Sequence, residues 1–248
     1  MHPESHLPTV TEPLYLDATR EQFEATVDRV VDDRVVLDRT HFYPEGGGQP
    51  ADTGVLRTDG DAWRVTDVQK RDTIYHHLEG DAEAPAPGTT VTGELDADRR
   101  RAHSRYHTAQ HLLSAVVLQA YDAETTGNQL YADRARLDCA YERFTDDDLE
   151  QIERRLTELI DEALPVRWYT LERTVAEDRL DPDRTRLDLL PDSITEVRIV
   201  EIGDDEPIDR TACAGTHVES TAELGRLEVT GRETRGPDEE RLRFRLLE

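Results

Sequence analysis

The 248-residue chain lacks any long hydrophobic run and contains only two cysteines, Cys139 and Cys213. No stretch approaches the roughly 18 apolar residues of a membrane-spanning helix, so we expect no membrane segment. The first residues show neither a basic nor an apolar region, so we expect no signal peptide. Two cysteines cannot form a disulfide framework. Together these absences predict a cytoplasmic protein.

Lysine is almost absent, and the charge is strongly acidic. Lys70 is the only lysine among 30 basic residues, against 55 acidic residues, and the formal net charge is −25. The acids are spread along the chain between apolar patterns, whereas an acidic tail would concentrate them. We therefore expect a folded, halophilic protein whose acidic surface keeps it soluble in a cytosol of very high salt.

The pattern before Asp96 is that of short strands. Two pairs of alternating runs flank the turn signals Asp32-Asp33 and Asp59-Gly60-Asp61, which predicts two hairpins. A loop rich in Pro, Ala and Gly at 80–88 precedes a further strand. Several short strands with regular turns and no long helix are typical of a small β-barrel. Residues 1–95 are therefore predicted to form a β-barrel domain.

After Asp96, helical and strand patterns mix. A helix is predicted at about 98–121, because its aliphatic residues form one stripe, and an alternating run at 130–141 predicts a strand. A capping box at 145–148 opens a second helix that ends before Pro165. Late strands are expected at 196–202, 225–230 and 241–246. This mixture predicts an α+β domain at 96–248, and an α+β fold class for the chain.

Three histidines, His103, His107 and His111, follow one another at intervals of four in the first predicted helix. This spacing places them on one face of the helix, one turn apart. That face lies roughly opposite the aliphatic stripe, whereas a histidine of the core would lie within it. The helix alone leaves three interpretations open: a metal site, a solvated polar face, or partners for nearby acidic residues.

Cys213 and His217 form a second pair with the same spacing, after the strand expected at 196–202. Two helical histidines with this pair supply three nitrogens and one sulfur, a tetrahedral set that Zn²⁺ favours. Cys213 could instead be a small buried hydrophobe, but that role suits Cys139 better, because Cys139 lies in an alternating apolar run. The two pairs together predict a zinc site.

A glycine-rich segment, Glu45-Gly-Gly-Gly-Gln-Pro50, lies in the first half. Three glycines allow a positive φ or a close approach of the backbone to a ligand. The segment is not a P-loop, because no Gly-Lys-Ser/Thr follows, and not a dinucleotide fingerprint, because no helix opens after it. A bulge or turn within the barrel is the alternative interpretation.

Three motifs occur in order along the chain: Phe42-Tyr-Pro-Glu-Gly-Gly-Gly-Gln-Pro50, His107-Thr-Ala-Gln-His111 and Cys213-Ala-Gly-Thr-His217. In this order they resemble the editing module of alanyl-tRNA synthetases, and more closely the free-standing AlaX family of alanyl-tRNA editing proteins in its medium form. The resemblance implies a zinc-binding editing domain and an aminoacyl-tRNA deacylase. Its partner would be tRNA(Ala) carrying serine or glycine, and it would hydrolyse the aminoacyl ester in trans. The oligomeric state stays open.

The resemblance also implies site residues. The metal ligands would be His107, His111, Cys213 and His217, and His103 falls outside the motif. Separately, their position in or close to the three motifs gives the candidate substrate-binding residues Gly46, Gly47, Gly48, Gln49, Thr108, Gln129 and Thr216, with ordinary capping or loop roles as the alternative for the polar ones. No catalytic residue is assigned. Ala214 stands where the family usually has glycine, and alanine tolerates a positive φ poorly.

Two other functions compete with editing. A non-catalytic, zinc-stabilised RNA-binding module would have a closed four-ligand site without an adjoining pocket. A metallohydrolase for small esters or amides would place a carboxylate base near the metal, but no His-Glu-x-x-His is present. The acidic charge opposes a tRNA substrate, although counterion release contributes little at very high salt. Arginine clusters at 99–101 and at 241–245 could contact RNA or balance acids.

Overall fold

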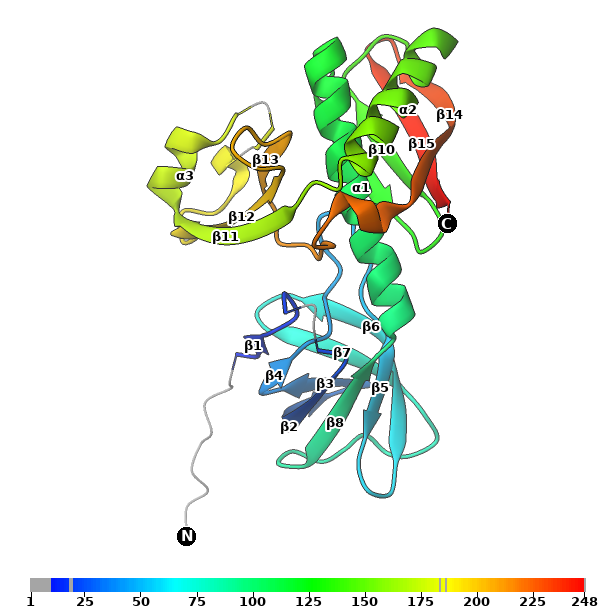
Figure 1. The fold of residues 1–248 in the computed structure, drawn as a ribbon. Helices are drawn as coiled ribbons and strands as arrows, with labels where there is room; N and C mark the ends of the chain where they lie inside the picture. The colour runs from blue at the N-terminus through cyan, green and yellow to red at the C-terminus, as the bar shows by residue number, and fades with distance from the viewer. Residues whose placement is uncertain (1–9, 18–19, 183, 186, 248) are drawn as a thin grey trace. The chain divides into compact units, whose positions relative to one another are not determined.

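The computed structural model describes residues 10–17, 20–182, 184–185 and 187–247 (Figure 1). It confirms the α+β fold class. The chain divides into two compact units, Met1–Gly46 with Pro50–Arg100, and Gly47–Gln49 with Arg101–Glu248. The described part of the chain has no helix with the length and apolar character needed to cross a membrane.

The first unit is a closed barrel with the strand order β2-β3-β7-β6-β5-β8. Its strands are β2 (Gln22–Val31), β3 (Arg34–Leu37), β5 (Gly54–Arg57), β6 (Ala62–Lys70), β7 (Ile74–Glu79) and β8 (Thr90–Leu95). Short strands β1 (Glu12–Pro13) and β4 (Arg39–Thr40) pair in parallel. Both predicted hairpins are confirmed, since β2 pairs with β3 around Asp32-Asp33 and β5 pairs with β6 around Asp59-Gly60. Val27, Val35 and Trp63 are among the side chains that fill the interior.

A buried ion pair ties the barrel to the first residues of α1 (Ala97–Tyr121). The Arg100 guanidinium contacts the Asp52 carboxylate, and Nη2 of Arg100 also donates to the carbonyl of His41 at 2.6 Å. Asp52 in turn accepts the backbone N–H of Tyr43 at 2.7 Å. Arg99 donates to the Ala51 carbonyl at 3.1 Å, so two of the three arginines at 99–101 bind groups of the first unit.

The second unit contains an antiparallel four-stranded sheet in the order β14-β15-β10-β9. These strands are β9 (Thr125–Leu130), β10 (Ala135–Cys139), β14 (Arg226–Gly236) and β15 (Glu239–Leu247). α1 and α2 (Asp146–Asp161) pack on this sheet through one apolar cluster that includes Leu113, Leu156 and Phe244. The capping box of α2 is confirmed: Thr145 Oγ1 accepts from the Asp148 N–H, and Asp148 accepts from the Thr145 N–H.

A smaller antiparallel sheet in the same unit has the order β11-β12-β13. Its strands are β11 (Val166–Glu172), β12 (Glu196–Ile202) and β13 (Asp209–Ala212). Between β11 and β12 the chain forms α3 (Arg173–Arg179) and a 3₁₀ turn at Leu187–Leu189, and a second 3₁₀ turn, Thr221–Leu224, precedes β14. The strand expected at 130–141 is confirmed only over β10, and the expectation that one strand begins at Leu130 is wrong. The chain turns between β9 and β10, where the Tyr131 N–H donates to the Arg134 carbonyl at 2.9 Å.

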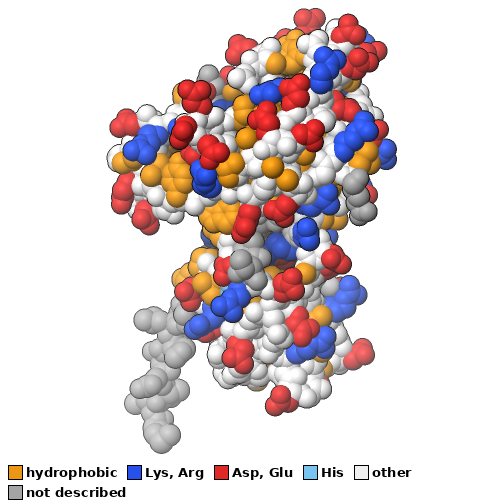
Figure 2. Space-filling model, viewed as in Figure 1, with side chains coloured by type: hydrophobic (Ala, Val, Ile, Leu, Met, Phe, Trp, Pro, Cys, Tyr) orange, Lys and Arg blue, Asp and Glu red, His pale blue; other side chains and the backbone are white. Residues whose placement is uncertain are grey.

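Acidic side chains are scattered over the face shown in Figure 2, with arginines between them. The arginines of β15 balance acids: Arg241 binds Asp138, Arg243 binds Glu233 and Arg245 binds Glu228. Even with such pairs, the acids exceed the basic residues by 25 in the whole chain. These excess negative charges repel one another in the folded state, which destabilises it unless salt screens the repulsion.

We expect the melting temperature to rise by roughly 10 °C or more between low and molar KCl, because screening weakens this repulsion. Thermal melting followed by circular dichroism across a KCl series measures the effect. A protein of near-zero net charge, melted over the same KCl series, is the control for salt effects that do not depend on charge. A melting temperature that stays constant over the KCl series would show that surface charge does not set stability.

Candidate metal centre

Four side chains from two of the motifs meet in the second unit. His107 and His111 come from α1, and Cys213 and His217 come from the segment after β13. Their potential ligand atoms all lie within 4.8 Å of one another. Cys213 Sγ lies 3.5 Å from His107 Nε2 and 3.4 Å from His217 Nε2. His103 is also buried but lies outside this group.

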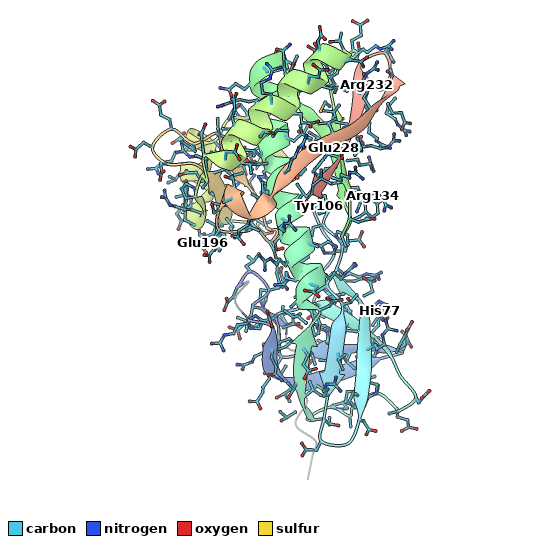
Figure 3. All side chains as sticks on the ribbon, turned by 45° about the vertical axis from the view of Figure 1, so that its right-hand side comes forward. His77, Tyr106, Arg134, Glu196, Glu228 and Arg232 are labelled. Atoms are coloured by element: carbon cyan, nitrogen blue, oxygen red, sulfur yellow. The ribbon has the colours of Figure 1, made fainter. Side chains whose placement is uncertain are left out.

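The orientation of α1 follows from its apolar face. Leu112, Leu113 and Val117 are fully buried in the core cluster on that face. Tyr106 lies on the same helix (Figure 3), and its hydroxyl accepts the N–H of Leu246 in β15 at 3.0 Å. These contacts fix the rotation of the helix, so residues four apart on another face, such as His107, are held in register.

His107, His111 and His217 each use the Nδ1 atom for a hydrogen bond to an oxygen. The partners are Gln49 Oε1 for His107 at 2.8 Å, Asp209 Oδ2 for His111 at 2.8 Å and Thr108 Oγ1 for His217 at 3.1 Å. An oxygen partner at Nδ1 orients the ring and leaves Nε2 for a metal. The Nε2 atoms of His107 and His217 are the ones that approach the Cys213 sulfur.

The hydrogen-bond network settles which ring nitrogens carry protons. Gln49 Oε1 also accepts the Thr216 N–H at 3.1 Å, so this atom is the acceptor for His107. The Thr108 hydroxyl donates to the Ser104 carbonyl at 3.1 Å, so it accepts from His217. Both rings are therefore protonated at Nδ1, with the lone pair at Nε2. This donor set fits a tetrahedral cation that binds nitrogen and sulfur.

Electrostatics favours the metal-binding forms of two ligands. Burial raises the pKa of the Cys213 thiol, but the nearby imidazoles of His107, His217 and His111 lower it more, to well below its ordinary value. Burial, with the neighbouring His107, lowers the pKa of His217 to about 3. A metal requires thiolate and neutral imidazole, so the directions of both pKa shifts favour the forms that bind a metal.

His111 differs from His217. Burial lowers its pKa, but the Cys213 thiolate and the Asp209 carboxylate raise it more, to about 9. Asp209 is itself buried, which raises its pKa, but its bond to His111 and the charge of Arg184 lower it below the ordinary value. Without a metal, His111 is thus a cation between two anions. A metal that binds Nε2 must displace its proton.

The loop that carries Cys213 is held by backbone contacts. Nη1 of Arg198 donates to the carbonyls of Cys213 at 2.7 Å and Gly215 at 3.1 Å, and its guanidinium lies 5.3 Å from the centre of the Trp168 ring. A Cβ on Gly215 would lie 2.0 Å from Cε1 of His107. Only glycine lets this loop lie flat on that ring. Ala214 is exposed and is not among the residues with positive φ, so its methyl group is accommodated.

The glycine-rich segment lies against β9. Gly48 has φ of 82°, its carbonyl accepts the Leu130 N–H at 2.9 Å, and a Cβ there would lie 1.6 Å from Asn128 Oδ1. Gly47 also has a positive φ, but a Cβ there would meet open space, and the nearest atom to a Cβ on Gly46 would lie 3.8 Å away. Close approach to β9 therefore explains Gly48, whereas Gly46 carries no such constraint.

The polar substrate-binding candidates are engaged with the metal ligands or the glycine segment. Gln49, Thr108 and Thr216 are buried, and Gln49 Nε2 donates to Thr216 Oγ1 at 2.9 Å. Gln129 is half-buried, and its Nε2 donates to the Gly48 carbonyl at 3.1 Å. Their contact with a substrate stays a prediction. Sequence reasoning missed Asp209, Arg184 and Arg198, because nothing in the sequence separates them from the many other charged residues.

Gly215→Ala should weaken metal binding by about tenfold or more, because the added methyl displaces the His107 ring from its position. Ala214→Gly is the matched control, since residue 214 is exposed, and should keep the affinity of the parent protein. Competition with a chromophoric chelator measures both, and a melting curve checks that both variants fold. Equal affinities would show that the loop moves freely away from the ring.

Metal affinity should increase with pH up to about 9, the pKa of His111 in the metal-free protein. Below that pH the proton on His111 competes with the metal, so the dissociation constant should fall by about tenfold per pH unit. Calorimetry at neutral pH in buffers of different ionisation enthalpy should show about one proton released per metal ion. An affinity that is independent of pH in this range would contradict the assignment of His111 as a cation.

Two family models match this chain. The model described as tRNA synthetases class II (A) covers residues 9–99, and the model described as Threonyl and Alanyl tRNA synthetase second additional domain covers residues 197–243. The second match contains Cys213 and His217, and the first contains the glycine-rich segment.

Curated relatives extend over almost the whole chain. The alanyl-tRNA editing protein AlaX-M of Methanosarcina barkeri is 40% identical over 246 residues, which cover 96% of this chain and 100% of that protein. The protein of the same name from Methanosarcina acetivorans is 39% identical, with 96% and 100% covered. The alanine–tRNA ligase of Pyrococcus furiosus is 38% identical over 90% of this chain, but over only 24% of the ligase. The resemblance of the three motifs is confirmed, and the chain belongs to the AlaX-M family of alanyl-tRNA editing proteins.

Proposed function

We propose that this protein is an aminoacyl-tRNA deacylase that hydrolyses mischarged tRNA(Ala) in trans, with Ser-tRNA(Ala) as its main substrate. One observation carries the proposal: a group of three buried histidines and one partly buried cysteine, with its ring orientations set, occurs in a chain related over 96% of its length to an alanyl-tRNA editing protein. Residues 1–95 would form the barrel domain and 96–248 the editing domain, and the reaction would take place in the cytoplasm.

The metal would be Zn²⁺, held by His107, His111, Cys213 and His217. Three imidazoles and a thiolate form a set that zinc favours over magnesium or calcium, which prefer oxygen. When bound, the ion supplies a positive charge that stabilises negative charge developing on an ester carbonyl. The four side chains form a closed set, which favours a role in positioning substrate over activating a water.

The protein's own groups hold this arrangement in place. Gln49, Thr108 and Asp209 fix the three rings, so little reorganisation accompanies the reaction. The Thr216 hydroxyl accepts from Gln49 Nε2 at 2.9 Å and from Ser104 Oγ at 2.8 Å. With both lone pairs occupied, its own proton is directed elsewhere and can be donated to the hydroxyl of a serine ester.

This donor supports selectivity for serine over alanine. A site that hydrogen-bonds a substrate hydroxyl disfavours the analogue that lacks it, because a buried polar group is then left unpaired. Thr216 is buried beside the metal ligand His217, so an unpaired hydroxyl there would be costly. Glycine esters lack this hydroxyl as well, and we expect them to be weaker substrates than serine esters.

The closed four-ligand set is also compatible with a non-catalytic, zinc-stabilised RNA-binding module. That function requires tRNA binding without release of the amino acid. The matched pair Cys213→Ala and Cys139→Ala separates the two functions, because Cys139 is a buried cysteine of the core and lies outside the metal group.

In high KCl, serine release from Ser-tRNA(Ala) should exceed alanine release from Ala-tRNA(Ala) by about a hundredfold. Cys213→Ala should lose most of the bound zinc and most of the activity, whereas Cys139→Ala should keep both. Thr216→Val should reduce the preference for serine with zinc content unchanged. Radiolabelled amino-acid release and metal analysis provide the readouts. If tRNA(Ala) binds but no serine is released, the non-catalytic function is correct.

A further inference from the structure

A cavity of about 430 Å³ in the second unit shares a wall with the metal centre. It is bordered by α1, by the segment after α3 and by the residues that lead into β13. Asp209, whose Oδ2 lies 2.8 Å from His111 Nδ1, belongs to its buried floor. Arg179 and Gln119 lie on its exposed rim. The volume is typical of small-ligand sites.

The charge of this cavity is opposite to that of the chain. Among the residues that the structure describes, three arginines and two aspartates line it: Arg179, Arg184, Arg210, Asp181 and Asp209. These five groups carry one more positive charge than negative charges, in a protein with a net charge of −25. Concave sites lined by one sign of charge concentrate ligands of the other sign. An anion is the ligand that this lining favours.

The three arginines are not equally engaged. Arg184 Nε lies 3.0 Å from Asp209 Oδ1, and Arg210 Nε lies 2.6 Å from Glu201 Oε2. The side chain of Arg179, at the end of α3, has no ion-pair or hydrogen-bond partner in the part of the chain that the structure describes. Its guanidinium can bind an anion without breaking an internal bond, and guanidinium groups match phosphate oxygens in geometry.

The remaining wall of the cavity is apolar. Leu118 of α1, together with Pro207 and Ile208, adds partly buried aliphatic surface to the lining. A nucleotide combines both features that this cavity needs, since its phosphate is anionic and its base has a flat apolar face.

We propose that this cavity binds one nucleotide unit, its phosphate at Arg179 and its base against Leu118 and Ile208. The choice of the source of this nucleotide rests on the proposed function. That source is the single-stranded 3′ end of tRNA(Ala), because the ester to be cleaved is at that end and Asp209 contacts His111 of the candidate metal centre. A free mononucleotide offers the same chemistry, and the experiments below separate the two sources.

The first experiment measures binding of AMP and of adenosine by calorimetry in constant KCl. Arg179→Gln should weaken AMP binding by about fivefold and leave adenosine binding unchanged, since only AMP carries the phosphate. The matched control is Arg154→Gln on α2, an exposed arginine outside the cavity with the same change of charge. Equal weakening in both variants would indicate a general charge effect and overturn the proposal.

The second experiment measures binding of tRNA(Ala) with and without its single-stranded 3′ nucleotides. If the tRNA end occupies the cavity, Arg179→Gln weakens binding of the complete tRNA and not of the trimmed one. If the site takes a free nucleotide, only AMP binding responds. A variant that binds AMP and both tRNAs like the parent protein overturns the proposal. Absence of serine release with an intact response to Arg179→Gln would refute the editing function alone.

Discussion

The hydrogen bonds at the three histidine Nδ1 atoms are the constraint on which the metal centre depends. An imidazole has two similar nitrogens, and a ring that could rotate would present either of them. Gln49, Asp209 and Thr108 each occupy one Nδ1, so the rings are held with the other nitrogen available. Loss of one such partner leaves four ligands present but one ring unoriented, which weakens metal binding without removing a ligand.

Asp209 does more than orient a ring. Its carboxylate is buried, and its two oxygens contact groups of opposite charge, His111 on α1 and Arg184 in the segment after α3. A buried carboxylate with two partners tolerates the loss of neither, because the remaining charges are then uncompensated in a medium of low dielectric. The smaller sheet, which carries Asp209 on β13, is thereby tied to the helix that carries two of the ligands.

The sequence identified the four side chains that the structure brings together but not the residues that support them, and the difference has a physical cause. Ligand pairs are local: spacing of four on a helix or in a tight loop brings two side chains together whatever the rest of the fold does. The supporting bonds are not local, since His107 and Gln49 are 58 positions apart and His111 and Asp209 are 98 apart. No periodicity connects such residues. Only the tertiary fold does, so Asp209 could not be distinguished among 55 acids.

The same distinction explains the fold predictions. Hairpins with Asp32-Asp33 and Asp59-Gly60-Asp61 turns were predictable, because the turn residues are specific to the backbone they form. The turn between β9 and β10, at 131–134, contains neither glycine nor proline, so the sequence carries no strong turn signal there. Strand β13 is only four residues long, too short for a pattern to emerge, yet it carries the acid that supports His111.

The three family motifs converge on one amide. Gly48 can approach β9 because it lacks a side chain, and its carbonyl is held there by the Leu130 N–H. The next residue, Gln49, is thereby placed where its oxygen accepts from His107 in the second motif and from the backbone of Thr216 in the third. A single fully buried amide thus contacts segments that are 58 and 167 positions away along the chain, and its oxygen and nitrogen are both engaged. The glycines therefore act on the metal centre through Gln49, which gives the first motif a structural reason to accompany the other two even before any contact with tRNA is considered.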